Sequence, residues 1–138
     1  MSQRENPFTG EWTFNAARSA LSTPAPKRWC QRIVATANEV HVREEIIGAD
    51  GSLKVVSVEA NIDGMDYPVI GSPVADVIAY TRLDVNNISG IAKKNDNVSL
   101  RETLTAAPED ETLTLTYGIF VGPNQVAHGV AVFNRTDS

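Results

Sequence analysis

The sequence predicts an all-β fold, a closed antiparallel up-and-down β-barrel of about 8–10 strands with one short helical turn near the N-terminus. Apolar and polar residues alternate with a period of two through most of the 138 residues, which is typical of strands that bury one face. Clusters of Asn, Asp, Gly and Pro recur at short intervals and indicate tight turns. The same alternation would also suit two packed sheets, so a β-sandwich is the alternative fold.

Ten segments carry the strand pattern in chain order. The first is short and is followed by a helical stretch at 16–21, which Asn15 could cap and which Pro24 prevents from continuing. Asp50-Gly51 is a strong hairpin signal between two of the later strands. Closing such a meander removes its exposed edges, which favours a barrel. The expected strands span 11–15, 31–37, 40–47, 52–61, 67–70, 77–83, 88–94, 98–105, 112–120 and 126–134.

Composition limits the function classes. A hydrophobic fraction of 42% and the absence of any linker-like tract indicate one globular domain over residues 1–138. The net charge of −5 disfavours nucleic acid as a partner. Cys30 is the single cysteine, so no intrachain disulfide can form. No apolar run is long enough for a membrane span, and the N-terminus does not resemble a secretory signal. We therefore expect a cytoplasmic protein; a secretion signal trimmed before expression is the alternative.

The strand pattern also predicts which polar side chains face the lumen. If the aliphatic residues of segments 40–47 and 98–105 point inward, Glu44 and Glu102 do so too. The same reasoning applied to three further segments gives the remaining candidates. The expected ligand-binding residues are Tyr80, Arg82, Glu102, Tyr117 and His128. A few polar groups in an apolar lining are what orient a small ligand. The alternative is that these side chains lie at strand ends and contact solvent.

Two further features could contribute to a site. Arg82, or Arg101 in its place, could pair with a tyrosine to bind a carboxylate; alternatively, Arg82 could form an ion pair at the barrel rim. The loop at 71–76 contains Gly71 and Pro73 and could form the mouth of the barrel, or could simply connect two strands. The two histidines, His41 and His128, lack metal-binding spacing, and no nucleotide-binding motif is present, so we expect neither a metal nor a cofactor.

The opening Gly10-Glu11-Trp12-Thr13-Phe14-Asn15 resembles the Gly-x-Trp start of the calycin superfamily, which contains the lipocalins and fatty-acid-binding proteins. Small uncharacterised bacterial lipocalin-like proteins are similar over that opening, which continues here to Arg18-Ser19, and over a central segment that starts at Asp63-Gly64 and runs to Asp84. The resemblance implies a barrel with a possible apolar-ligand cavity. It also implies that Trp12 closes one end, with an arginine such as Arg135 packed against it. It implies no particular activity.

Together these observations lead us to expect non-enzymatic binding of a small apolar or amphipathic ligand in the barrel lumen. One alternative is an interaction module whose barrel is filled with aliphatic side chains, and which could form a homodimer. A less favoured alternative is a barrel enzyme in which a lumenal histidine or carboxylate acts as general acid or base.

Overall fold

The computed structural model describes residues 6–136. The first five residues, which entered the expectation about a secretory signal, lie outside this range. Apart from one 3-10 turn, η1 (Ala16–Arg18), all the regular elements in this range are strands. They are β1 (Gly10–Phe14), β2 (Ala20–Leu21), β3 (Arg28–Ala35), β4 (Glu39–Ile47), β5 (Leu53–Asn61), β6 (Asp66–Ile70), β7 (Val77–Asp84), β8 (Asn87–Lys94), β9 (Asn97–Ala107), β10 (Thr112–Val121) and β11 (Asn124–Arg135).

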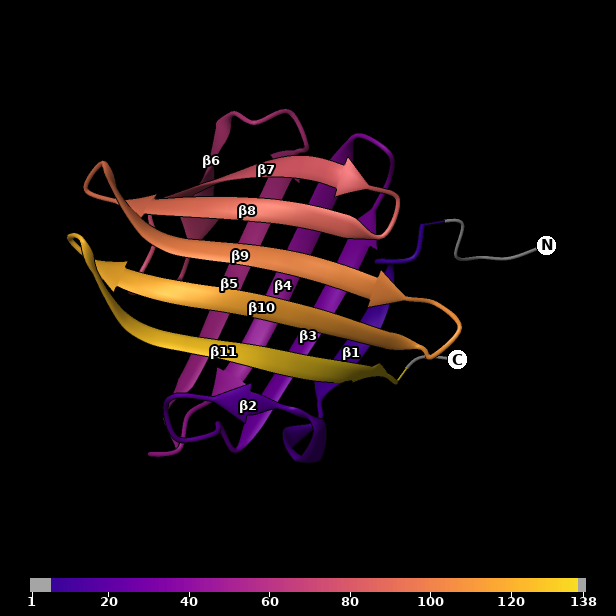
Figure 1. The fold of residues 1–138 in the computed structure, drawn as a ribbon, viewed down its shortest axis with the longest axis horizontal. Helices are drawn as coiled ribbons and strands as arrows, with labels where there is room; N and C mark the ends of the chain where they lie inside the picture. The colour runs from indigo at the N-terminus through magenta and orange to yellow at the C-terminus, as the bar shows by residue number, and fades with distance from the viewer. Residues whose placement is uncertain (1–5, 137–138) are drawn as a thin grey trace.

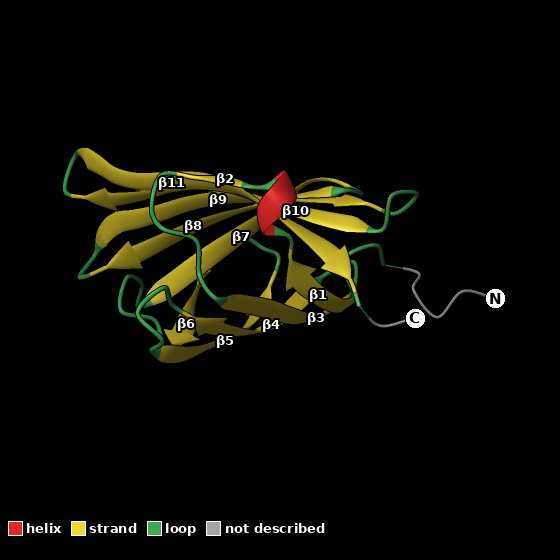
Figure 2. Ribbon diagram, turned by 90° about the horizontal axis from the view of Figure 1, so that it is seen from below, coloured by secondary structure: helices red, strands yellow, loops and turns green. Residues whose placement is uncertain are grey.

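Ten of these strands form a closed antiparallel barrel. Each strand from β3 to β11 pairs with the next, β1 pairs with β3, and β1 also pairs with β11. This last ladder places Trp12 opposite Arg135 and closes the ring. Figure 1 shows β7–β11 as the front wall and β1 with β3–β5 as the back wall, whose strands cross the front ones steeply. Figure 2 shows the same two walls from below. The predicted all-β, up-and-down barrel with one helical turn is confirmed.

One end of the barrel is filled by large apolar side chains. Trp12 is almost fully buried there, and its indole Nε1 donates a hydrogen bond of 3.0 Å to the carbonyl oxygen of Phe8. Burying groups of this size supplies most of the free energy that favours folding. We call this region the sealed end; its fully buried members are Phe8, Trp12, Ile33, Val40, Ile88, Leu113 and Phe133.

Arg135 covers Trp12 at the sealed end. Its guanidinium carbon lies 4.3 Å from the centre of the indole ring, within the range of a cation–π contact. Nη1 of the same side chain donates a hydrogen bond of 2.7 Å to the carbonyl oxygen of Thr9. The first and last strands of the barrel are therefore joined by side chains as well as by their backbone ladder. This is the Trp–Arg packing that the resemblance implied.

The structure corrects the sequence prediction at residues 16–21. The helical stretch ends after one 3-10 turn, and Ala20 and Leu21 form the short strand β2 against β11. Asn15 does cap the turn, since its side-chain oxygen accepts from the amide of Ala17. The hydroxyl of Ser19 donates to the carbonyl oxygen of Asn15 and accepts from the amide of Val132, which directs the chain along the edge of β11 instead of into a longer helix.

The direction of the side chains in β11 is also corrected. His128 and Val130 are exposed, whereas Gly129 and Ala131 are buried, so the strand faces inward with its small residues. The sequence misleads because the larger aliphatic residues of this strand lie on its outer face. Gly129 is on the inner face because it stands directly opposite Tyr117, and a Cβ at this position would lie 2.7 Å from the tyrosine hydroxyl.

Candidate functional site

The half of the barrel away from the sealed end contains a cavity of about 220 Å³. Both walls contribute to it, together with the connection between β6 and β7. Every second residue of each strand faces the lumen, and most of the residues that do so here are aliphatic. The aliphatic lining residues are Val42, Ile46, Val56, Val58, Val69, Val74, Ala75, Ile78, Ala92, Leu100, Leu104, Leu115 and Ile119. A cavity of this size and character is suited to a small, largely apolar molecule.

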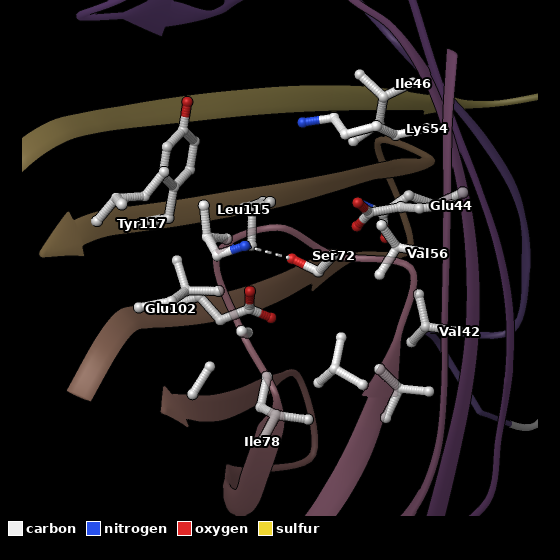
Figure 3. Close-up of a pocket in the computed structure, with 18 of the residues that line it drawn as sticks. Val42, Glu44, Ile46, Lys54, Val56, Ser72, Ile78, Glu102, Leu115 and Tyr117 are labelled. Carbon is white, nitrogen blue, oxygen red and sulfur yellow. Dashed lines mark hydrogen bonds between the residues drawn. The ribbon is translucent and has the colours of Figure 1, made fainter. Parts of the chain in front are cut away.

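The loop of residues 71–76 forms part of the cavity wall. Gly71 has a φ of +89°, and a Cβ there would overlap the carbonyl oxygen of Val55, so both backbone conformation and space require glycine. The hydroxyl of Ser72 accepts a hydrogen bond from the amide of Val74, as drawn in Figure 3. Lys94 Nζ donates to the carbonyl oxygen of Pro73 at 2.8 Å. The loop is therefore held against the barrel by β5 and β8.

Two carboxyl groups project into this cavity from opposite walls. Glu44 comes from β4 in the back wall and Glu102 comes from β9 in the front wall, and Figure 3 shows both side chains directed inward. Neither is fully buried by surface area, because their remaining accessible surface faces the cavity. Within residues 6–136, neither carboxyl group forms an ion pair with a basic side chain within 4 Å.

Glu44 has nitrogen donors around it. Gln31 stands directly opposite it on β3, and Trp29 and Lys54 also line the cavity. Burial raises the pKa of Glu44 to about 7, with the positive charge of Lys54 and the indole N–H of Trp29 acting in the opposite direction. The indole falls short of hydrogen-bond geometry, and Trp29 Nε1 and Gln31 Nε2 are buried donors with no acceptor.

Glu102 has a different environment. It lies opposite Tyr117 on β10 and opposite Gly90 on β8, and Gly90 in turn lies opposite Tyr80 on β7. A Cβ at Gly90 would lie 3.1 Å from Glu102 Cγ and 3.1 Å from Tyr80 Cε1, so the absent side chain leaves room for both neighbours. These residues form a row across four strands, Tyr80–Gly90–Glu102–Tyr117, which we call the tyrosine–glutamate row.

Burial and like charge disfavour ionisation along this row. Burial, with a smaller contribution from the negative charge of Glu44, raises the pKa of Glu102 to about 8. Burial also raises the pKa of Tyr80 well above its ordinary value, and the charges of Glu102 and Glu44 add to this. The pKa of Tyr117 is raised by burial alone. At neutral pH the cavity therefore holds protonated or partly protonated carboxyl groups beside neutral phenols.

Three of the five predicted site residues line the cavity: Tyr80, Glu102 and Tyr117. His128 does not, because it lies on the outer face of β11 and is exposed. Its expected lumenal position is therefore wrong.

Arg82 is also outside the cavity lining. It shares the inward phase of Tyr80 but lies at the sealed end, where it is opposite Ile88. Its Nη2 donates to the carbonyl oxygen of Thr36 at 3.1 Å, in the turn between β3 and β4. The expected lumenal position of Arg82 is wrong, because the strand carries it past the hollow half of the barrel to that turn. The proposed substitute, Arg101, is exposed.

Sequence reasoning missed Lys54, Gln31 and Trp29 as cavity residues. The signal for Lys54 was present, since it alternates with the inward-facing Val56 and Val58 on β5. Trp29 and Gln31 alternate in the same way with the inward-facing Ile33 on β3, but an aromatic and a polar residue at these positions do not give the aliphatic alternation by which the inner face of the other strands was recognised.

The comparisons with known proteins add no family. No protein-family model matches the sequence, and the curated proteins contain no match to it. In the described part of the chain, no helix is long and apolar enough to cross a membrane. Across residues 6–136, no three His, Cys, Asp or Glu side chains are grouped so that they could hold a metal ion.

Proposed function

We propose that this protein binds a small apolar or amphipathic molecule in the lumen of a calycin-like barrel, without converting it chemically. The observation that carries the proposal is the cavity of about 220 Å³, which has a mainly aliphatic lining interrupted by a few polar side chains. The Trp12–Arg135 packing and the ten-strand ring support the calycin-like assignment.

The cavity counts against the alternative of a filled barrel, and the positions of the two histidines count against one form of the enzyme alternative. A barrel filled by its own aliphatic side chains would leave no such space. An enzyme that uses a lumenal histidine as general base is disfavoured, because His128 lies on the outer face and His41 is exposed beside Glu39, at 3.2 Å. The remaining polar groups of the cavity suffice to orient a ligand.

The proposal is tested with neutral probes and one variant that fills the cavity. Val42 lines the cavity, whereas Val34 lies on the outer face of the neighbouring strand and is 55% exposed. We expect 2-phenylethanol to raise the melting temperature of the wild type and of Val34→Trp, because a bound ligand stabilises the folded state. Val42→Trp should abolish the shift.

The probe set for this experiment is 2-phenylethanol, cyclohexanol and 1-octanol, each titrated into the millimolar range. The absence of a thermal shift with all three and with phenethylammonium would contradict lumenal binding. An equal shift in Val42→Trp would also contradict it, since the probe would then bind outside the cavity. Circular dichroism of each variant establishes that the barrel has formed before the titrations are compared.

A further inference from the structure

The two lumenal carboxyl groups differ in what surrounds them. The nitrogen-bearing side chains of the cavity lining are Trp29 and Gln31 from β3 and Lys54 from β5, all in the wall that carries Glu44. Gln31 is 3% exposed, and its Nε2 has no acceptor. The positive charge of Lys54 and the indole N–H of Trp29 favour the anionic form of Glu44. In the described lining, the opposite wall provides no nitrogen donor for Glu102.

Glu102 instead has an aromatic ring beside it. The ring of Tyr80 reaches over Gly90 toward Glu102, because a Cβ at Gly90 would lie 3.1 Å from both Tyr80 Cε1 and Glu102 Cγ. Tyr117 stands directly across from Glu102, but its ring extends the other way, over Gly129 on β11. A carboxylate beside a phenol ring attracts a positive charge in two ways. The carboxylate forms an ion pair, and the negative face of the ring attracts a cation.

A negatively charged ligand would meet the opposite situation. It would have to approach two carboxyl groups, and the one cationic side chain of the lining, Lys54, is in the wall of Glu44. An amphipathic carboxylic acid, such as a fatty acid, is thus disfavoured by charge. A neutral ligand would leave Glu102 protonated and would gain no ion pair.

The volume limits the size of the occupant. A protein cavity of about 150 Å³ accommodates benzene, which has six non-hydrogen atoms. By proportion, 220 Å³ corresponds to about nine such atoms. One aromatic ring with a two-carbon chain and an amino group has this size.

We propose that the lumen binds a small organic ammonium ion, with its positive charge beside Glu102 and the ring of Tyr80 and its apolar body against the aliphatic lining. This inference rests on the lumenal binding proposed above and names the chemical class of the ligand. The groups that titrate around the bound charge are Glu44, Glu102 and the ammonium of Lys54, together with the two phenols.

The test compares three probes of nearly equal shape by calorimetric titration: phenethylammonium, 2-phenylethanol and phenylacetate. We expect affinity to fall in that order at pH 7.5. Glu102→Gln keeps the size of the side chain but removes its charge. It should weaken phenethylammonium binding about tenfold, the typical effect of losing one charged contact, and change 2-phenylethanol binding less than threefold. The matched control is Glu45→Gln, which alters an exposed glutamate on β4 and should leave all three affinities unchanged.

Proton release gives an independent readout. Because a neighbouring cation favours the ionised form of Glu102, phenethylammonium binding near pH 7 should release a proton. The measured enthalpy should then differ between phosphate and Tris buffers, and the difference should largely disappear in Glu102→Gln. The affinity for phenethylammonium should also rise between pH 6 and pH 8.5.

The outcomes separate this inference from the proposal on which it depends. If 2-phenylethanol or phenylacetate binds as tightly as phenethylammonium, or if Glu102→Gln leaves their affinity ratio unchanged, the ammonium inference is overturned while lumenal binding stands. If the neutral probes bind and phenethylammonium does not, the inference is likewise overturned. If none of the neutral probes or phenethylammonium binds at millimolar concentration, both proposals are overturned.

Discussion

Glu44 and Glu102 should make the folded state less stable as the pH rises from 5.5 to 6.5, because they ionise in the unfolded chain but stay largely protonated in the barrel. In the unfolded chain both groups have pKa values near 4.5, whereas in the barrel the pKa values are about 7 and about 8. The folded chain therefore keeps two protons in this range that the unfolded chain releases. The stability contributed by these protons is fully present below pH 4.5, decreases progressively above it, and is lost once the pH has risen through the two higher pKa values.

The magnitude follows from the number of protons. Each proton bound by the folded chain but not by the unfolded chain changes the free energy of unfolding by about 1.4 kcal/mol per pH unit. Two protons would give about 2.7 kcal/mol between pH 5.5 and pH 6.5. Glu44 is already partly ionised at the upper end of this range, so we expect a decrease of about 2 kcal/mol.

The assay is urea unfolding followed by tryptophan fluorescence at the two pH values. Glu102→Gln should remove roughly half of the decrease, and a variant that also carries Glu44→Gln should remove nearly all of it. Glu45→Gln should behave as the wild type. Asp50, Asp63 and Asp84 do not interfere, because hydrogen bonds lower their pKa values and place their titration below this pH range. A free energy of unfolding that is constant or rises with pH in the wild type would refute this reasoning.

Three further predictions concern the barrel itself. Replacing Arg135 by Met removes the cation–π contact and the partly buried hydrogen bond to Thr9 at the sealed end, and should lower the free energy of unfolding by about 2–3 kcal/mol in urea titrations. A loss below about 0.5 kcal/mol would contradict the importance of this cap. Gly71→Ala places a side chain on a left-handed backbone and also creates a steric overlap, so it should lower the melting temperature strongly. Gly122→Ala tests the left-handed backbone alone, because its added Cβ meets no atom within 4 Å, and it should lower the melting temperature far less. Equal effects would show that the overlap at Gly71 is relieved. Leu113→Ala should cost about 2–5 kcal/mol of stability because this side chain is fully buried, whereas Val34→Ala on the outer face should stay within about 0.5 kcal/mol; similar losses would contradict the packing described here.

The fold was predictable because most strands bury one face of a barrel. Val40 and Val42 on β4, and Leu113 and Leu115 on β10, alternate with outward-facing residues, and the structure places all four inward. This periodicity is local, so it can be recognised without knowing which strand pairs with which.

The errors arose where long-range contacts decide the outcome. The inward-facing Gly129 is matched to Tyr117, twelve residues earlier, whose ring occupies the space where its side chain would lie. The period of two therefore predicted the strand but not which of its two faces points inward, and His128 was assigned to the wrong face. In the same way, the position of Arg82 along the barrel axis depends on the tilt and register of β7, which sequence alternation does not specify.

The candidate site was predictable only in part for the same reason. Inward-facing Glu102 and Tyr117 follow from alternation within their own strands. That Tyr80 lies in the same row as Glu102 depends on Gly90 between them, and thus on the pairing of three strands. The contrast between the two carboxyl groups likewise requires knowledge of which wall holds Lys54.

The ladder between β1 and β11 has a consequence for how this protein folds during its synthesis. The two strands that close the ring begin at residue 10 and end at residue 135, so their partner positions are separated by nearly the whole chain. During synthesis the early strands leave the ribosome long before their final partner exists. Ring closure must therefore wait until β11 has been synthesised, and the nascent chain carries open strand edges until then. Contact with chaperones would be most useful to the protein during this interval.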